Sequence, residues 1–268
     1  MGMRSVKRIA TAALDRIGVA DRVLAARRRD IALLYHGVES TPTGYHWSVS
    51  AANFAAHLSY LERNVELVPL GALFEAPGHR SRAAITFDDA YADIYDHVAP
   101  LIVARRIPIT VFVPTRFIEE GNSLLQRDEL PYAKAHMSWA QMRELMASGL
   151  VCFESHTHSH LLAPAYVEQL GTEIDASVRL LEQRLGYRSR FFAYPYGTWN
   201  EQTNAVARAH SMIRLFGFQS VPIRHTVVEG RFDICRRNEQ LASFKLTVAG
   251  VNSDALRGML GAAPRLRL

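Results

Sequence analysis

Short apolar runs alternate along the chain with longer segments in which apolar residues recur at helical spacing. Runs rich in β-branched and aromatic residues predict strands, whereas an apolar residue every three or four positions predicts an amphipathic helix. The predicted strands are 31–36, 83–87, 109–115, 150–155 and 191–194, with weaker ones near 212–218 and 232–237. The predicted helices are 50–64, 91–105, 138–148, 165–185 and 200–210. This alternation predicts an α/β fold with a mainly parallel sheet.

One connection breaks the alternation. Residues 116–137 show no clear periodicity, and a connection of that length is usually a functional loop. The helix after it is well defined, because Ser138 and Gln141 form a capping-box pattern and Gly149 provides a stop. We find no internal repeat and no linker rich in Pro, Gly or Ser. Residues 31–268 are therefore expected to form a single domain.

Residues 1–30 form a separate basic arm. Its apolar residues have helical spacing, with a weak point at Gly18; they are Val6, Ile9, Ala13, Ile17, Ala20 and Leu24. Two interpretations stay open: a helix packed on the domain, or a helix lying on an anionic membrane surface. No apolar core of a signal peptide follows the basic residues. We therefore expect a bacterial protein that is cytoplasmic or peripheral to the cytoplasmic membrane.

Length and charge narrow the function classes. The 268 residues suffice for one barrel of roughly 200–250 residues, and 49% hydrophobic with 21% charged residues excludes a disordered chain. The arm holds eight basic and three acidic residues, so the net charge of +5 lies there and the remaining 238 residues are neutral. Binding of nucleic acid by the domain is therefore not expected. The two cysteines, Cys152 and Cys235, are expected to be buried free thiols rather than a disulfide framework.

Histidines and carboxylates follow two of the predicted strands. His156, His158 and His160 come directly after strand 150–155. In an extended chain His156 and His160 would be about 13 Å apart, whereas a helical turn would bring these two to one face and direct His158 elsewhere. Asp88 and Asp89 follow strand 83–87, and buried adjacent carboxylates are unfavourable unless something uses them. Helix capping by Asp89 and a chance histidine cluster remain the alternatives.

Two further candidates stand at strand ends. Pro195 and Gly197 flank Tyr196 after strand 191–194, which predicts an irregular turn with the Tyr196 N–H directed into a cleft. His36 ends strand 31–36, although a lone histidine is most often structural. The active sites of parallel-sheet enzymes gather at the carboxyl ends of the strands. Four polar clusters at four such ends therefore predict one active site.

At these residues the sequence resembles the polysaccharide deacetylases of the NodB-homology type, carbohydrate esterase family 4. ITFDDAY, SHTHSH and AYPYG match the three motifs of that family, in order, within residues 31–245. The resemblance implies a distorted (β/α)₇-type barrel. It also implies Asp88 as general base, Asp89, His156 and His160 as metal ligands, and the Tyr196 backbone N–H as oxyanion donor.

Some positions depart from the family pattern. Ala90 stands where the family has Gly, and Ala193 stands where it often has an Arg that orients the base; Arg236 or Arg237 is the expected replacement. The late L-x-H that supplies a general acid is not evident. Leu34-Tyr35-His36 resembles the permuted branch of the family, in which this motif comes first. The resemblance therefore favours His36 as the general acid, with His225 as the second candidate.

The resemblance implies a metal-dependent hydrolase with one divalent metal ion, expected to be Zn²⁺. Its substrate would be an N-acetylated glycan: an N-acetylhexosamine polymer, an oligosaccharide or a lipid-linked sugar, from which acetate is released. The alternatives are an O-acetyl carbohydrate esterase with the same site, or an inactive glycan-binding or scaffold protein. Two histidines with one carboxylate also occur in non-haem iron oxygenases, but those usually have a β-sandwich rather than an α/β fold.

Overall fold

The computed structural model describes residues 3–41, 43–76, 78–123, 134–219, 222–236 and 238–251. A nine-stranded sheet, parallel at every pairing, has the order β10-β9-β8-β7-β6-β5-β1-β11, with β4 beside β5. Its strands are β1 (Asp30–Tyr35), β4 (Glu66–Leu67), β5 (Arg82–Phe87), β6 (Ile109–Val113), β7 (Val151–Ser155), β8 (Phe191–Ala193), β9 (Arg214–Phe216), β10 (Val228–Glu229) and β11 (Phe232–Asp233). A small parallel pair, β2 (Gly37–Glu39) and β3 (Ser48–Ser50), follows β1.

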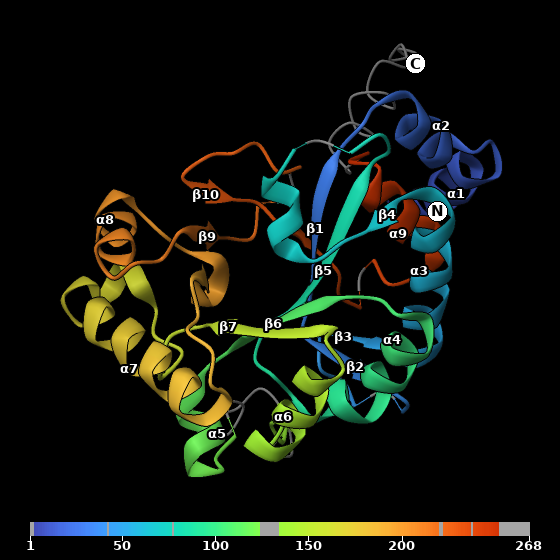
Figure 1. Cartoon of the computed structure of the whole chain (residues 1–268). Helices are drawn as coiled ribbons and strands as arrows, with labels where there is room; N and C mark the ends of the chain where they lie inside the picture. The colour runs from blue at the N-terminus through green and yellow to red at the C-terminus, as the bar shows by residue number, and fades with distance from the viewer. Residues whose placement is uncertain are drawn as a thin grey trace.

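Helices surround the curled sheet (Figure 1). They are α1 (Met3–Arg16), α2 (Val19–Ala26), α3 (Ala51–Asn64), α4 (Ala99–Arg105), α5 (Thr115–Glu120), α6 (Trp139–Ala147), α7 (Val167–Leu185), α8 (Glu201–Ala209) and α9 (Leu241–Val248). Short 3₁₀ turns occur at Leu70–Phe74, Ala163–Ala165 and Pro195–Gly197, and a π turn at Ile94–Val98. The predicted α/β fold with a distorted (β/α) barrel is confirmed.

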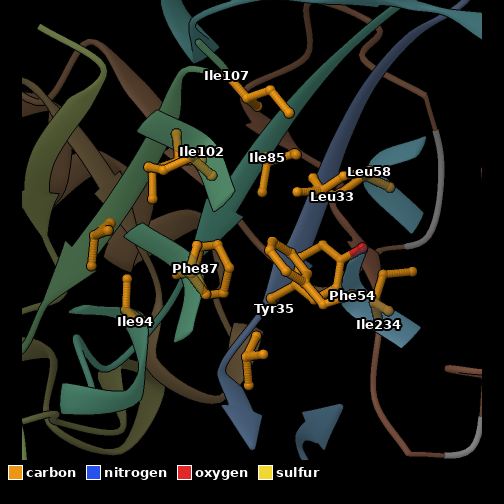
Figure 2. Close-up of a cluster of buried hydrophobic side chains, with 14 of the residues drawn as sticks. Leu33, Tyr35, Phe54, Leu58, Ile85, Phe87, Ile94, Ile102, Ile107 and Ile234 are labelled. Atoms are coloured by element: carbon orange, nitrogen blue, oxygen red, sulfur yellow. The ribbon is translucent and has the colours of Figure 1, made fainter. Parts of the chain in front are cut away.

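The two-residue period of the strands decides which side chains face the helices. On β1 and β5, Leu33, Tyr35, Ile85 and Phe87 belong to the main core, where the Tyr35 ring lies 5.3 Å from that of Phe54 on α3 (Figure 2). The alternate positions, such as Ala32 and Ala84, belong to a second cluster with Phe112 and Phe216 inside the barrel. The residues that continue this inner row are His36 after β1 and Asp88 after β5.

The segment between β10 and β11 joins the two edges of the sheet. β10 pairs with β9 at one edge, and β11 pairs with β1 at the other. Only Gly230 and Arg231 separate the two strands, and Arg231 is fully buried. The chain thus crosses from edge to edge here, and it carries an arginine across the barrel.

The arm packs against the domain. It is broken at Gly18, which adopts a left-handed conformation (φ 66°) between α1 and α2. Tyr60 donates a hydrogen bond to Asp21 (2.8 Å), and Lys245 on α9 pairs with Asp15 (2.8 Å). Leu24 is buried, whereas Ile9 and Ile17 are 57% and 56% exposed. Part of the arm is therefore packed on the domain, as the first interpretation expects. The exposed Ile9 and Ile17 remain accessible for contact with a membrane surface.

Within the ranges described above, no helix combines the length and the apolar character needed to cross a membrane.

Several short elements differ from the sequence predictions. The connection 116–137 contains most of helix α5, too short for a periodic pattern, while residues 124–133 lie outside the described residues. Strands β2, β3, β4 and β10 have two or three residues each, and α9 was not predicted. Both cysteines are free, as expected, but Cys152 is exposed because it stands on the face of β7 opposite Val151 and Phe153.

Candidate active site

The register between β1 and β5 brings His36 beside Asp88. Tyr35 is aligned with Phe87, and the Asp88 N–H donates to the Tyr35 carbonyl (2.9 Å). His36 directly follows β1, so both side chains stand at the carboxyl end of the barrel interior. Both residues are buried.

Asp88 forms a two-point ion pair with Arg231. Nη1 of Arg231 donates to Oδ1 (2.6 Å) and Nη2 to Oδ2 (2.8 Å), while the guanidinium lies over the Phe112 ring. Burial alone would raise the pKa of Asp88, but the opposing effect of its surroundings, led by the charge of Arg231, holds the pKa below its ordinary value. Asp88 is therefore ionised and oriented at neutral pH.

Arg231 corrects the prediction for the orienting arginine. Arg236 lies 3.7 Å from Glu39 in an ion pair away from Asp88, and Arg237 lies outside the described residues. The candidate residues were expected at strand ends, whereas Arg231 precedes strand β11. Because β11 begins only at the level of Leu33 on β1, the long side chain reaches from there to Asp88. The available signal was an arginine placed directly before the weakly predicted strand 232–237.

Asp89, His156 and His160 form a group that could hold a metal ion. Their nearest ligand atoms all lie within 4.8 Å of one another, and Asp89 Oδ1 is 3.8 Å from His156 Nε2 and 3.4 Å from His160 Nε2. Asp89 Oδ1 is buried and has no hydrogen-bond partner among the described residues. Burial, and then the charge of Asp88, raise the pKa of Asp89 to about 8. A bound cation would pair with the Asp89 oxygen and would offset the repulsion between Asp88 and Asp89.

The two histidines suit a metal because both are neutral. Burial lowers the pKa of His156 and lowers that of His160 well below its ordinary value. The Nδ1 of His156 lies 2.8 Å from the Ala193 carbonyl, so Nδ1–H donates there and Nε2 keeps its lone pair facing Asp89. The Ala193 carbonyl thus fixes the tautomer of His156, a candidate ligand. Ala193 stands where the family often has an arginine.

The histidine loop brings together the expected pair by a different route. Residues 156–160 are not helical: Thr157 and His160 both adopt left-handed conformations, with φ of 63° and 57°. The helical-turn argument was therefore wrong, although His156 and His160 do converge. His158 points elsewhere, as expected, and its Nδ1 is 2.9 Å from Thr115 Oγ1. Glu173 on α7 accepts the backbone N–H of His158 (3.0 Å) and of Ser159 (2.6 Å), which holds the loop in this shape.

The Asp88-Asp89-Ala90 turn also uses left-handed backbone. Asp89 has φ 69° and Ala90 has φ 53°. Aspartate tolerates this region better than most residues, but for an alanine it costs roughly 1–2 kcal/mol compared with right-handed backbone. The family glycine would avoid that cost, so surrounding contacts must hold this turn at Ala90.

Tyr196 stands at the rim of the site. It adopts φ 58° between Pro195 and Gly197, which confirms an irregular turn, and its side chain is 55% exposed. Its ring centroid lies 4.7 Å from that of His160. The turn therefore brings the Tyr196 ring against His160, a member of the candidate metal group.

His36 lies against aromatic rings, whereas His225 is elsewhere. The His36 ring is 5.2 Å from Trp47 and 6.1 Å from Phe218. Burial lowers the pKa of His36 to about 4, although Asp88 acts in the opposite direction, so the ring is neutral in the protein alone. His225 packs against Phe74 and lies two residues from Ile223, which bonds to the first residue of β1. His225 is thus at the opposite end of the barrel.

An α/β barrel with carboxylates and histidines gathered at the carboxyl ends of its strands is an arrangement typical of barrel enzymes. The family model described as polysaccharide deacetylase matches residues 75–213. This is more than half of the chain, which therefore belongs to the polysaccharide deacetylase family. The matched segment contains Asp88, Asp89, His156, His160 and Tyr196, whereas His36 and Arg231 lie outside it.

Individual relatives agree with this assignment. YxkH of Bacillus subtilis (strain 168), a protein named as a polysaccharide deacetylase, is 28% identical over 179 residues, which cover 64% of this chain and 58% of YxkH. A poly-β-1,6-N-acetyl-D-glucosamine N-deacetylase of Staphylococcus epidermidis is 31% identical over 126 residues, 44% of this chain and 41% of that protein. The matched regions thus span less than two thirds of these relatives.

Solved structures share the fold. IcaB from Ammonifex degensii superposes with a TM-score of 0.70 at 23% identity, covering 82% of this chain and 97% of that one. The deacetylase PplD from Streptococcus pyogenes gives 0.71 at 20% identity, covering 82% and 98%. At such identities the likeness concerns the fold.

Proposed function

We propose that this polysaccharide deacetylase is a metal-dependent hydrolase that removes N-acetyl groups from a glycan containing N-acetylhexosamine. The observation that carries the proposal is the Asp89, His156 and His160 group beside an ionised Asp88 held by Arg231. The name of the S. epidermidis relative supports an N-acetylglucosamine substrate. Acetate release from N-acetylated and O-acetylated sugars tests the proposal, and release from the O-acetyl sugars alone would favour an esterase.

Asp89, His156 and His160 would hold the metal. Two neutral imidazoles and one carboxylate are the donor set of many catalytic zinc sites, so Zn²⁺ is the proposed ion. When bound, such an ion polarises the acetyl carbonyl and makes a nearby water more acidic. The partnerless Asp89 oxygen and the fixed tautomer of His156 are the features of this chain that fit it.

Asp88 would act as the general base. Its carboxylate is ionised at neutral pH, and Oδ2 lies 3.8 Å from His156 Nε2, next to the proposed metal position. It would accept the proton of the attacking water, while Arg231 keeps the carboxylate in one orientation. The backbone N–H of Tyr196 would donate to the developing oxyanion.

His36 would supply the proton to the leaving amine. Because its ring is neutral in the protein alone, it must take up a proton during the reaction, and Asp88 is the nearby anion that favours its charged form. The overall reaction adds water across the amide bond and yields acetate and a free amine. Trp47 and Phe218 pack against the ring.

Loss of any proposed ligand should abolish metal binding. We expect His156→Ala, His160→Ala and Asp89→Ala each to lose stoichiometric zinc and activity. His158→Ala is the matched control, since its ring bonds to Thr115 and not to the group. Elemental analysis of the purified variants measures this. Loss of zinc from His158→Ala, or full zinc content in His160→Ala, would contradict the assignment of the ligands.

Replacement of His36 should affect substrates according to their leaving groups. An amine must be protonated to depart, whereas an aryl oxide needs little assistance. We expect His36→Ala to slow amide cleavage much more than cleavage of an activated aryl acetate. The comparison of kcat/KM on the two substrates measures the effect. Equal losses on both would indicate that His36 is structural.

We also propose that residues 1–30 attach the protein peripherally to the cytoplasmic face of an anionic membrane. Support comes from the net charge of the arm and from the exposed Ile9 and Ile17. Each basic residue contributes about 1 kcal/mol near such a surface, and salt weakens the attraction.

Co-sedimentation with anionic vesicles is therefore expected at low salt and should decrease at high salt. The matched variant Ile9→Ser/Ile17→Ser removes the exposed apolar pair and should bind less. Failure of the full chain to sediment, or equal binding by the variant at all salt concentrations, would contradict attachment through this helix.

A further inference from the structure

A short strap lies across the turn that carries Asp89. We define the strap as residues 134–137. The Ala92 N–H donates to the Ala135 carbonyl (2.8 Å), and the Met137 N–H donates to the Ala90 carbonyl (2.9 Å). Tyr91 and His136 between them form an isolated antiparallel bridge. The strap thus follows the backbone from Ala90 to Ala92, directly after the proposed metal ligand.

Both ends of the strap are anchored. At one end, Nζ of Lys134 lies 2.6 Å from Asp93 Oδ2 and 3.3 Å from Glu39 Oε1, and all three side chains are largely buried. At the other end, Ser138 and Gln141 form the capping box that begins α6. A segment fixed at both ends can hold a strained turn in place.

His136 makes the contact closest to the metal group. Its Nδ1 lies 2.7 Å from the backbone carbonyl of Asp89, so Nδ1–H donates. Its ring is stacked between Tyr91, at 5.1 Å and 23°, and Phe117, at 5.8 Å and 29°. The two rings pack against the imidazole, and the hydrogen bond holds the Asp89 carbonyl.

We propose that His136 is a positioning residue for Asp89, acting through the peptide that joins Asp89 to Ala90. This role rests on the metal site of the proposed function. Asp89 and Ala90 are both left-handed, with φ of 69° and 53°, and the direction of the Asp89 carboxylate depends on that backbone. His136 and Met137 together bond to the carbonyls of both residues. The strap therefore keeps the carboxylate directed at His156 and His160.

Two substitutions distinguish the effect of the His136 hydrogen-bond donor from the effect of its ring. His136→Phe keeps the stacking on Tyr91 and Phe117 but removes the donor. His136→Asn removes the ring but keeps an N–H donor at nearly the same place as Nδ1. The measurements are the Zn²⁺ dissociation constant of each metal-free protein, by competition with a chromophoric chelator, and the Tm of the metal-free protein. Phe117→Leu is the control, because it loosens the stack and leaves the hydrogen bond.

The expected result is a Zn²⁺ affinity for His136→Phe that is about tenfold or more below wild type, the usual scale for a group that orients a ligand. His136→Asn should recover most of that affinity even if its Tm is lower, and Phe117→Leu should bind close to wild type. Wild-type affinity in His136→Phe would overturn the proposal, as would equal weakening in His136→Asn. A wild-type protein that binds no Zn²⁺ would instead contradict the metal site itself, and this role with it.

Discussion

Arg231→Met is expected to destabilise the protein by about 3–5 kcal/mol and to abolish deacetylation. The reason is the fully buried ion pair with Asp88: removal of one partner leaves an uncompensated charge in the barrel interior. Methionine fills much of the same volume, so the loss of charge rather than a cavity dominates. Denaturant unfolding of the two proteins measures the difference in the free energy of unfolding.

The pH dependence of that difference has a definite sign. The depressed pKa of Asp88 means that the wild type gains stability above the unfolded pKa of about 4 and loses it as pH falls through the lower folded value. In Arg231→Met the pKa of Asp88 should rise, because burial is then unopposed by the arginine. On acidification the unpaired Asp88 carboxylate of the variant therefore becomes protonated and loses its charge. The difference in the free energy of unfolding between wild type and variant should then decrease.

A double replacement provides the matched control for this effect. Arg231→Met/Asp88→Leu removes both charges and should recover much of the lost stability without recovering activity. A gap in the free energy of unfolding that stays constant with pH, or a double variant no more stable than the single one, would contradict the ion-pair account.

Asp88→Asn is expected to reduce kcat by at least about 100-fold while zinc stays bound. The amide has the shape of the carboxylate but cannot accept the proton of water, and general bases usually contribute that much or more. The ligand group of Asp89, His156 and His160 does not include Asp88, so metal content should remain stoichiometric. Steady-state kinetics and elemental analysis on the same preparation measure both quantities.

The partly exposed Asp175 on α7 provides a matched Asp→Asn control. It pairs with His210 on α8 and lies outside the candidate site, so Asp175→Asn should keep the wild-type rate. An Asp88→Asn protein that retains most of the wild-type kcat would show that another group serves as the base. Loss of zinc from it would show that Asp88 holds the metal.

Longer elements of the fold could be predicted from sequence because their patterns are long enough to read. The buried strand β5 and the 19-residue helix α7 with its stop at Gly186 match their predicted places closely. Strand β10 has only two residues and no periodicity, and β11 occupies only the start of the weakly predicted strand 232–237. The pairing of both depends on the curvature of the whole sheet. The closure of the barrel through Arg231 therefore could not be inferred.

The residues of the candidate site also fall into those that the sequence predicts and those that it does not. Asp88, Asp89 and the histidines stand in local motifs directly after strands, where a parallel sheet brings them together. Arg231 and His136 reach the site from segments that are distant in sequence and have no motif of their own. The convergence of His156 and His160 was expected from a helical turn, but Glu173 and two left-handed residues produce it, and neither feature is visible in the spacing.

Acetate release from a β-1,6-linked N-acetylglucosamine oligosaccharide tests the central proposal most directly. The zinc-loaded protein should release acetate and expose one free amine per acetate. A chelator should stop the reaction, added zinc should restore it, and Asp88→Asn should be at least about 100-fold slower under the same conditions. If no N-acetylated sugar yields acetate, or if release is unaffected by both the chelator and the Asp88 replacement, the proposed function is contradicted.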